Sequence, residues 1–251
     1  GRYALRNNTT AGNNTAVGAC ALYSNTTGPY VTGVGYRALK SNTTGEYNTA
    51  VGYSLVNNTT GASNAGFGTD TLNQNTTGGC NTAIGIGSLN ANTTGNHNVA
   101  SGFDALRQNT TASQNTAFGG CTLYANTTGA YNTGVGFKAL VSNTCGNSNV
   151  AVGYSALCGN TTGRMNTATG MFALLTNTTG TCNTASGYKS MYSNTSASFN
   201  TAYGWKSLHD NTTGNKNTGV GFEALGNNTT GTHNSAFGNY SLYTNTTGTH
   251  N

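Results

Sequence analysis

The chain has 251 residues, of which 15 carry a formal charge (10 Lys or Arg plus 5 Asp or Glu), and it contains 37 Gly but one Pro. Ordinary soluble domains are about a quarter charged, so a charged fraction of 6% excludes a conventional charged surface and charge-rich disorder alike. The net charge of +5 is spread without a basic cluster, so we expect no nucleic-acid partner.

A tetrapeptide close to NTTG recurs from one end of the chain to the other and marks a tandem repeat. Successive copies start 17 residues apart, except that the fourth follows the third after 16 residues. We therefore predict one repeat domain, residues 1–251, as a segment of a longer fibre. In chain order the repeats start at Asn8, Asn25, Asn42, Asn58, Asn75, Asn92, Asn109, Asn126, Asn143, Asn160, Asn177, Asn194, Asn211 and Asn228, with a partial repeat from Asn245.

The repeat is numbered here from its first Asn, which is position 1. Asn at positions 1 and 7, Thr at 2, Ala or Gly at 9, Gly at 11 and Leu near 15 are nearly constant, whereas positions 5, 6, 13, 16 and 17 accept almost any residue. Across positions 7–12, for example residues 48–53, small constant residues alternate with variable ones. This period of two predicts a strand whose constant side chains point inward. We expect Gly at positions 4 and 11 to bend the chain through positive φ.

The pattern predicts an all-β fold, a parallel β-solenoid with one 17-residue repeat per coil and about 15 coils. The abundance of Gly, Asn and Thr argues against helices. Identical units match their neighbours in parallel register, and we expect two or three short strands in each coil. One buried Leu contributes about 2–3 kcal/mol, less than the cost of ordering a repeat. A coil therefore depends on its neighbours.

The repeat resembles the 17-residue repeats of surface and tail-fibre proteins of bacteria, phages and large viruses, as in NTTGEYNTAVGY from Asn42 and NTTGNKNTGVGFEAL from Asn211. It is more distantly similar to the head repeats of trimeric autotransporter adhesins, which form a left-handed β-roll. The resemblance covers the whole chain. It implies an extended extracellular or virion fibre used for attachment or scaffolding.

The position-1 asparagines have two interpretations. Most lie in the sequence Asn-Thr-Thr, a formal acceptor for N-glycosylation. Overlapping acceptors occur at Asn7, Asn13, Asn57 and Asn227. Alternatively the amides stack inside the solenoid as an asparagine ladder. Acceptors on stacked coils would lie about 4.8 Å apart, too close for a glycan on each coil, which favours the ladder.

Position 12 is often aromatic. If these side chains point outward, they form an apolar stripe that indicates an interface between chains, and if the strand phase is shifted by one residue they lie in the core instead. The residues are Tyr36, Tyr53, Phe103, Phe137, Tyr154, Tyr188, Trp205 and Phe222.

Other side chains give weaker signals for chemistry. The six cysteines fall in different columns, with Cys145 and Cys158 in one repeat as the pair best placed for a disulfide. His233 and His250 share position 6, too few ligands for a metal. The five acidic residues fall in different columns or distant repeats, so we expect no acid–base pair, no enzyme activity and no cofactor.

We therefore predict a structural protein that self-associates into an extracellular, cell-surface or virion-surface filament. Covalent glycans are the one other partner class that the sequence suggests. No apolar run of 18 residues occurs, so we expect no membrane insertion. The alternative is an ice-binding solenoid that presents a regular Thr array at position 2 or 8. The position-8 file is interrupted by Ala65, Val99, Val150 and Ser235.

Overall fold

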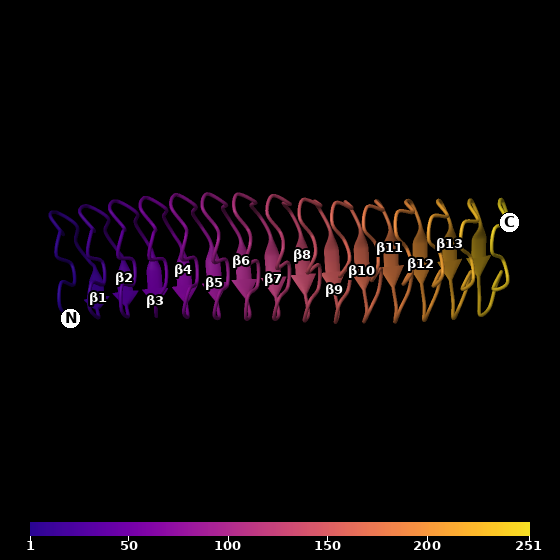
Figure 1. Ribbon diagram of the computed structural model, residues 1–251, viewed down its shortest axis with the longest axis horizontal. Coiled ribbons are helices and arrows are strands. Elements are labelled where there is room, and N and C mark those ends of the chain that lie inside the picture. Colours follow the sequence, from indigo (N-terminus) through magenta and orange to yellow (C-terminus); the bar gives the residue numbers. More distant parts are fainter. The chain divides into compact units, whose positions relative to one another are not determined.

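The computed structural model describes residues 1–251. They group into two compact units, Gly1–Thr128 and Gly129–Asn251. Each unit is a parallel β-solenoid in which every repeat forms one coil with one three-residue strand, at positions 8–10 of the repeat (Figure 1). The predicted all-β solenoid fold is confirmed.

In the first unit the strands pair in chain order, all parallel. They are β1 (Thr15–Val17), β2 (Thr32–Val34), β3 (Thr49–Val51), β4 (Ala65–Phe67), β5 (Thr82–Ile84), β6 (Val99–Ser101) and β7 (Thr116–Phe118). The second unit repeats this order. Its strands are β8 (Thr133–Val135), β9 (Val150–Val152), β10 (Thr167–Thr169), β11 (Thr184–Ser186), β12 (Thr201–Tyr203), β13 (Thr218–Val220) and β14 (Ser235–Phe237).

The expectation of two or three strands per coil is wrong. The remainder of each coil turns too sharply to be a strand, although its backbone still bonds to neighbouring coils. For example, the Leu157 N–H donates to the Ala173 carbonyl at 3.0 Å, and Thr161 N–H donates to Thr178 at 3.0 Å. The coil is thus held by inter-coil hydrogen bonds well beyond its strand.

The sharp turns come from residues in the left-handed region of backbone space. Non-glycine residues at positions 6, 13 and 15 have positive φ in coil after coil, as in Met165 (54°), Phe172 (61°) and Leu174 (50°). Such a conformation costs an ordinary residue about 1–3 kcal/mol and is a genuine outlier for a β-branched one. Accordingly, none of these positions holds Val, Ile, Thr or Pro in any repeat. Positions 6 and 13 are therefore more restricted than the sequence pattern suggested.

The glycines at positions 4 and 11 differ in role. Position 11 has positive φ as predicted, and a Cβ on Gly153 (φ 135°) would lie 2.6 Å from the Gly170 carbonyl oxygen. The prediction of positive φ at position 4 is wrong. There a Cβ would crowd the asparagine amides, since on Gly78 it would lie 2.5 Å from the Asn75 Oδ1. Position 4 holds Gly or, at Ala11, Ala112 and Ala197, the smallest residue with a Cβ, which leaves room for the asparagine side chains.

The core of each unit is narrow. Leu at position 15 and Ala at position 9 are fully buried, as in Leu106 and Ala100. The residue at position 14, which the sequence pattern did not single out, is also buried, as in Ala105. It is Ala, Ser or Thr in every coil, because a larger side chain would not fit between the stacked coils.

The 16-residue repeat is accommodated outside the core. The strand register continues through it, with Thr49 beside Ala65 in the neighbouring strand. The Leu39 N–H then donates to the Ser54 carbonyl at 3.2 Å, the bond that a position-14 residue makes elsewhere. The missing residue is therefore the position-13 turn residue between Tyr53 and Ser54.

Candidate functional site

The position-1 asparagines form the predicted ladder. The Asn75 Nδ2 donates to the Asn58 Oδ1 of the preceding coil at 2.7 Å and to the Gly78 carbonyl of its own coil at 2.9 Å. The Asn75 Oδ1 accepts from the Asn92 Nδ2 of the following coil at 2.8 Å. Both amide hydrogens and the amide oxygen are thus used within the protein.

A second asparagine ladder, which the sequence analysis did not foresee, runs along position 7. The Asn149 Oδ1 accepts from the backbone N–H of Asn166 at 3.0 Å. The Asn149 Nδ2 donates to the Gly163 carbonyl of the following coil at 2.9 Å. The recurrence of Asn at position 7 in all repeats but one was the available signal.

This geometry conflicts with glycosylation of the first ladder. Thirteen position-1 asparagines, from Asn25 to Asn228, are fully buried. The Nδ2 atom that would carry a sugar already donates two hydrogen bonds in each well-formed rung. In the folded chain these amide groups are buried and already hydrogen-bonded within the protein. The half-buried Asn8 and Asn245 lie in the outer repeats, whereas the overlapping acceptors Asn7, Asn13 and Asn57 are exposed and Asn227 is half-buried.

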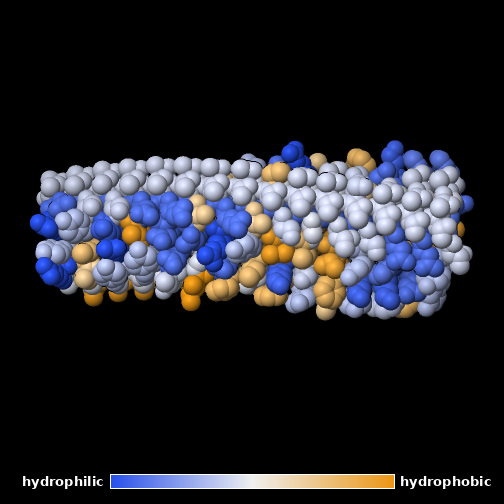
Figure 2. All heavy atoms as spheres, viewed as in Figure 1, coloured by the Kyte–Doolittle hydropathy of each residue, from blue (hydrophilic) through white to orange (hydrophobic).

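The position-12 aromatic side chains point outward. Tyr36 and Phe103 are 55% and 57% exposed, Trp205 and Phe222 are both 37% exposed, and Tyr53 is half-buried. The core alternative for this column is therefore wrong. The rings of Trp205 and Phe222 stack with centroids 4.6 Å apart and planes 6° apart. Figure 2 shows hydrophobic residues exposed on the visible face of the molecule.

Cationic side chains accompany several of these rings. The Lys206 Nζ lies 4.3 Å from the Trp205 ring centroid, and the Lys138 Nζ lies 5.3 Å from that of Phe137. Arg37 lies over Tyr36 at 5.1 Å. Each contact is a cation–π interaction, so the aromatic column is a mixed surface of ring edges and positive charge.

The threonine hydroxyls at position 2 are not free to bind an outside partner. At position 2 the hydroxyl donates to the backbone carbonyl of the position-2 Thr in the next coil, as from Thr26 to Thr43 at 3.1 Å. The position-3 residues beside them, such as Thr27, Thr77 and Thr162, are exposed. At position 8, by contrast, threonines such as Thr32 and Thr49 are half-buried. The most exposed regular threonine column is thus at position 3, and not at position 2 or 8 as the ice-binding alternative expects.

All six cysteines are unpaired thiols, so the Cys145–Cys158 disulfide does not form in this structure. Burial raises the pKa of the half-buried Cys158 thiol, with Lys138 acting in the opposite direction. His233 and His250 stack with ring centroids 4.8 Å apart. No three His, Cys, Asp or Glu side chains converge as a group that could hold a metal ion.

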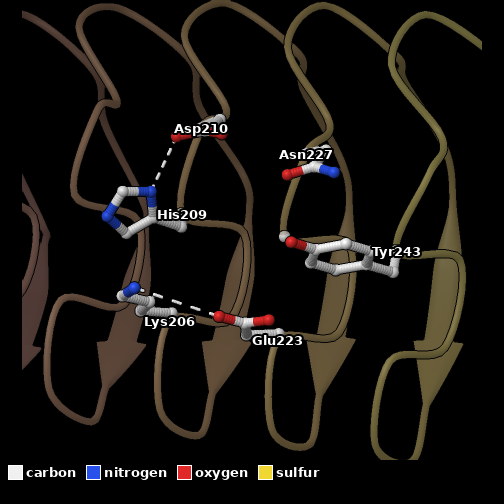
Figure 3. A pocket seen from close by; sticks show the side chains of 7 residues that line it. Lys206, His209, Asp210, Glu223, Asn227 and Tyr243 are labelled. Atoms are coloured by element: carbon white, nitrogen blue, oxygen red, sulfur yellow. Dashed lines mark hydrogen bonds and ion pairs between the residues drawn. The ribbon is translucent and has the colours of Figure 1, made fainter.

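The acidic residues are mostly paired. Both Asp104 carboxylate oxygens accept from the Arg107 guanidinium, at 2.8 and 2.9 Å, and this hydrogen bonding raises the pKa of Arg107. Asp210 and Glu223 line one surface hollow together (Figure 3). They come from different columns, as the sequence shows, and each is paired with a neighbouring basic side chain, His209 or Lys206.

Comparison with known proteins gives no relative to reason from: neither a protein-family model, nor a curated protein, nor a solved structure matches the chain significantly. The structure contains no apolar helix of the length needed to cross a membrane.

Proposed function

We propose that the chain is a structural segment of an extracellular or surface-exposed filament, whose role is to hold a fixed extended geometry for attachment or scaffolding. The supporting observation is the first asparagine ladder. Each rung, such as Asn75, bonds both to its own coil and to the coils on either side. The interactions that hold one coil are thus the interactions that join it to the next, as in other repeat arrays.

The aromatic column supplies a surface for self-association. Its members are consecutive at Tyr188, Trp205 and Phe222, so a second copy with the same coil spacing can match these rings one to one. Monomeric proteins rarely expose long contiguous apolar patches. We therefore propose that neighbouring chains associate laterally through the column that includes Tyr188, Trp205 and Phe222.

Sedimentation velocity and electron microscopy of the 251-residue protein test this proposal. Wild type should form dimers or lateral bundles that weaken when Trp205 and Phe222 are both replaced by Ser. Phe199→Ser is the matched control, because Phe199 is 59% exposed but lies at position 6. A wild-type protein that stays monomeric at high concentration, or a control as damaging as the double variant, would refute lateral association.

Ice binding is the second candidate. The observation in its favour is the exposed position-3 file, which repeats Thr at one place in most coils. Thermal hysteresis of the purified protein distinguishes the two candidates, since a structural filament predicts none. A hysteresis that disappears in a Thr77→Lys, Thr94→Lys variant would favour ice binding instead.

A further inference from the structure

The second unit carries one hollow that the repeat pattern does not generate. It lies in the position-16 column, where the successive residues are Tyr192, His209, Gly226 and Tyr243. The Tyr192 and His209 rings stack with centroids 5.2 Å apart and planes 5° apart. Gly226 interrupts this column, and no other repeat has Gly at position 16.

The missing side chain shapes the site. A Cβ on Gly226 would lie 2.9 Å from the Cε2 atom and 3.0 Å from the Cδ2 atom of Tyr243. The absence of that Cβ lets the Tyr243 ring lie against the Gly226 backbone, at one side of a hollow of about 200 Å³ (Figure 3). Pockets for drug-sized ligands measure about 300–1,000 Å³, so this one suits a single small ring.

The lining gathers polar groups that are rare in this chain. Lys206, Asp210 and Glu223 are three of its 15 charged residues (10 basic plus 5 acidic), and all three line the hollow with His209 and Asn227. In Figure 3 Lys206 and Glu223 lie on one side, Asp210 and Asn227 lie on the other, and His209 and Tyr243 lie between.

Both charged pairs in the hollow, one long and one short, keep unused hydrogen-bonding capacity. The Lys206 Nζ and Glu223 Oε1 are 4.0 Å apart, and the His209 Nδ1 lies 2.7 Å from the Asp210 Oδ1. The second carboxylate oxygens can accept further hydrogen bonds, while the ammonium and the Asn227 amide can donate them. With His209 neutral, one base and two acids leave the hollow with a formal charge of −1, which disfavours anions.

The ligand that uses donors, acceptors and an aromatic ring without carrying charge is a polyhydroxylated ring. We propose that this hollow binds one neutral sugar ring of a glycan. Its apolar C–H face lies on Tyr243, and its hydroxyls donate to Asp210 and Glu223 and accept from Lys206 and Asn227. The glycan would be a soluble or surface glycan bound non-covalently. This proposal does not depend on whether the chain assembles into a filament.

Saturation-transfer NMR on the 251-residue protein tests the proposal with three probes, the methyl glycosides of glucose, galactose and N-acetylglucosamine. A ligand this small should bind with a Kd of about 1 mM. We expect saturation transfer to at least one probe, reduced about five-fold or more by Tyr243→Ala and by Glu223→Gln. Loss of transfer to all three sugars on addition of an equal concentration of inorganic phosphate would overturn the proposal.

Two further variants keep the test decisive if Tyr243→Ala unfolds the protein. Gly226→Asn fills the hollow with a residue that position 16 already holds at Asn73 and Asn90, and it should abolish transfer while the chain stays folded. Tyr124→Ala removes a position-16 tyrosine from the other unit and should leave transfer unchanged. No transfer in wild type, or full transfer in Gly226→Asn, would overturn the proposal.

Discussion

Asn48 and Asn58, in successive coils, donate to the same carbonyl oxygen, that of Gly61, at 2.7 and 2.9 Å. The first belongs to the position-7 ladder and the second to the position-1 ladder. A position-4 carbonyl therefore joins both ladders, and it does so in a residue that must stay small because a Cβ on Gly61 would lie 2.5 Å from the Asn58 Oδ1. The two ladders act as one network, so a defect in either should affect both.

A position-1 asparagine should not tolerate replacement by a residue that cannot donate a hydrogen bond. In Asn177→Asp the carboxylate cannot donate to the Asn160 Oδ1 (2.8 Å) or to the Gly180 carbonyl (3.1 Å). A buried charge facing two acceptors should lower the free energy of unfolding by about 3–5 kcal/mol. Urea denaturation at pH 7 measures the change. The control is Asn215→Asp, which is exposed and keeps its acceptor role toward the Ser198 N–H, and it should change stability by less than about 0.5 kcal/mol.

The left-handed leucines should reject β-branched residues of similar size. Leu157 has φ of 51° and is fully buried. Leu157→Val should cost about 2–4 kcal/mol, combining one lost methylene with backbone strain. Leu157→Met should cost less than about 1.5 kcal/mol, since Met191 occupies the same position at φ 50°. Equal destabilisation by Val and Met would contradict the role of the backbone conformation.

The turn at position 13 should accept changes in length that the strand cannot. Inserting one Gly between Tyr53 and Ser54 restores a 17-residue repeat and should leave the thermal midpoint within a few degrees of wild type. Deleting Thr82 shortens a coil within its strand and turns the inward side chain of Ala83 toward the outer face. That variant should lose most of its cooperative unfolding transition. A deletion tolerated as well as the insertion would argue against a fixed strand register.

The two thiols Cys80 and Cys158 should differ in their reactivity. Cys80 is exposed, whereas burial raises the pKa of the half-buried Cys158. A raised pKa leaves less thiolate at a given pH, and the thiolate is the nucleophile. Iodoacetamide at pH 8 should therefore modify Cys80 faster, and the Cys158 rate should still be rising at a pH where a free cysteine has levelled off. Mass spectrometry of timed digests follows both sites, and faster labelling of Cys158 would contradict its burial.

Much of the fold could be predicted because every coil is a copy of the last. The inward position of Ala83 and the parallel register follow from repeated columns with a period of two, whereas that pattern allows two interpretations each for Asn75 and Trp205. The second ladder could not be predicted, because a constant Asn does not reveal whether its Oδ1 accepts from a side chain or, as for Asn149, from a backbone N–H.

The turn geometry was the other feature of the fold that could not be predicted from the sequence. Residues as different as Phe172 and Lys189 occupy position 13, so the column looked unrestricted although both have positive φ. These residues are all unbranched at Cβ, a shared property that is not apparent when they are compared by charge or hydropathy. The Gly226 hollow depends on one exception to the repeat, and its significance appears only when Tyr243 is seen lying against it.

The first ladder also has a direction. The rungs from Asn25 to Asn126 and from Asn160 to Asn245 all donate from Nδ2 toward the lower-numbered coil, as Asn92 does to Asn75. Aligned amide dipoles add and polarise one another, so each unit has a donor side and an acceptor side. A coil presented upside down would place donor against donor, and the asparagine column therefore selects one orientation for any coil that stacks upon it.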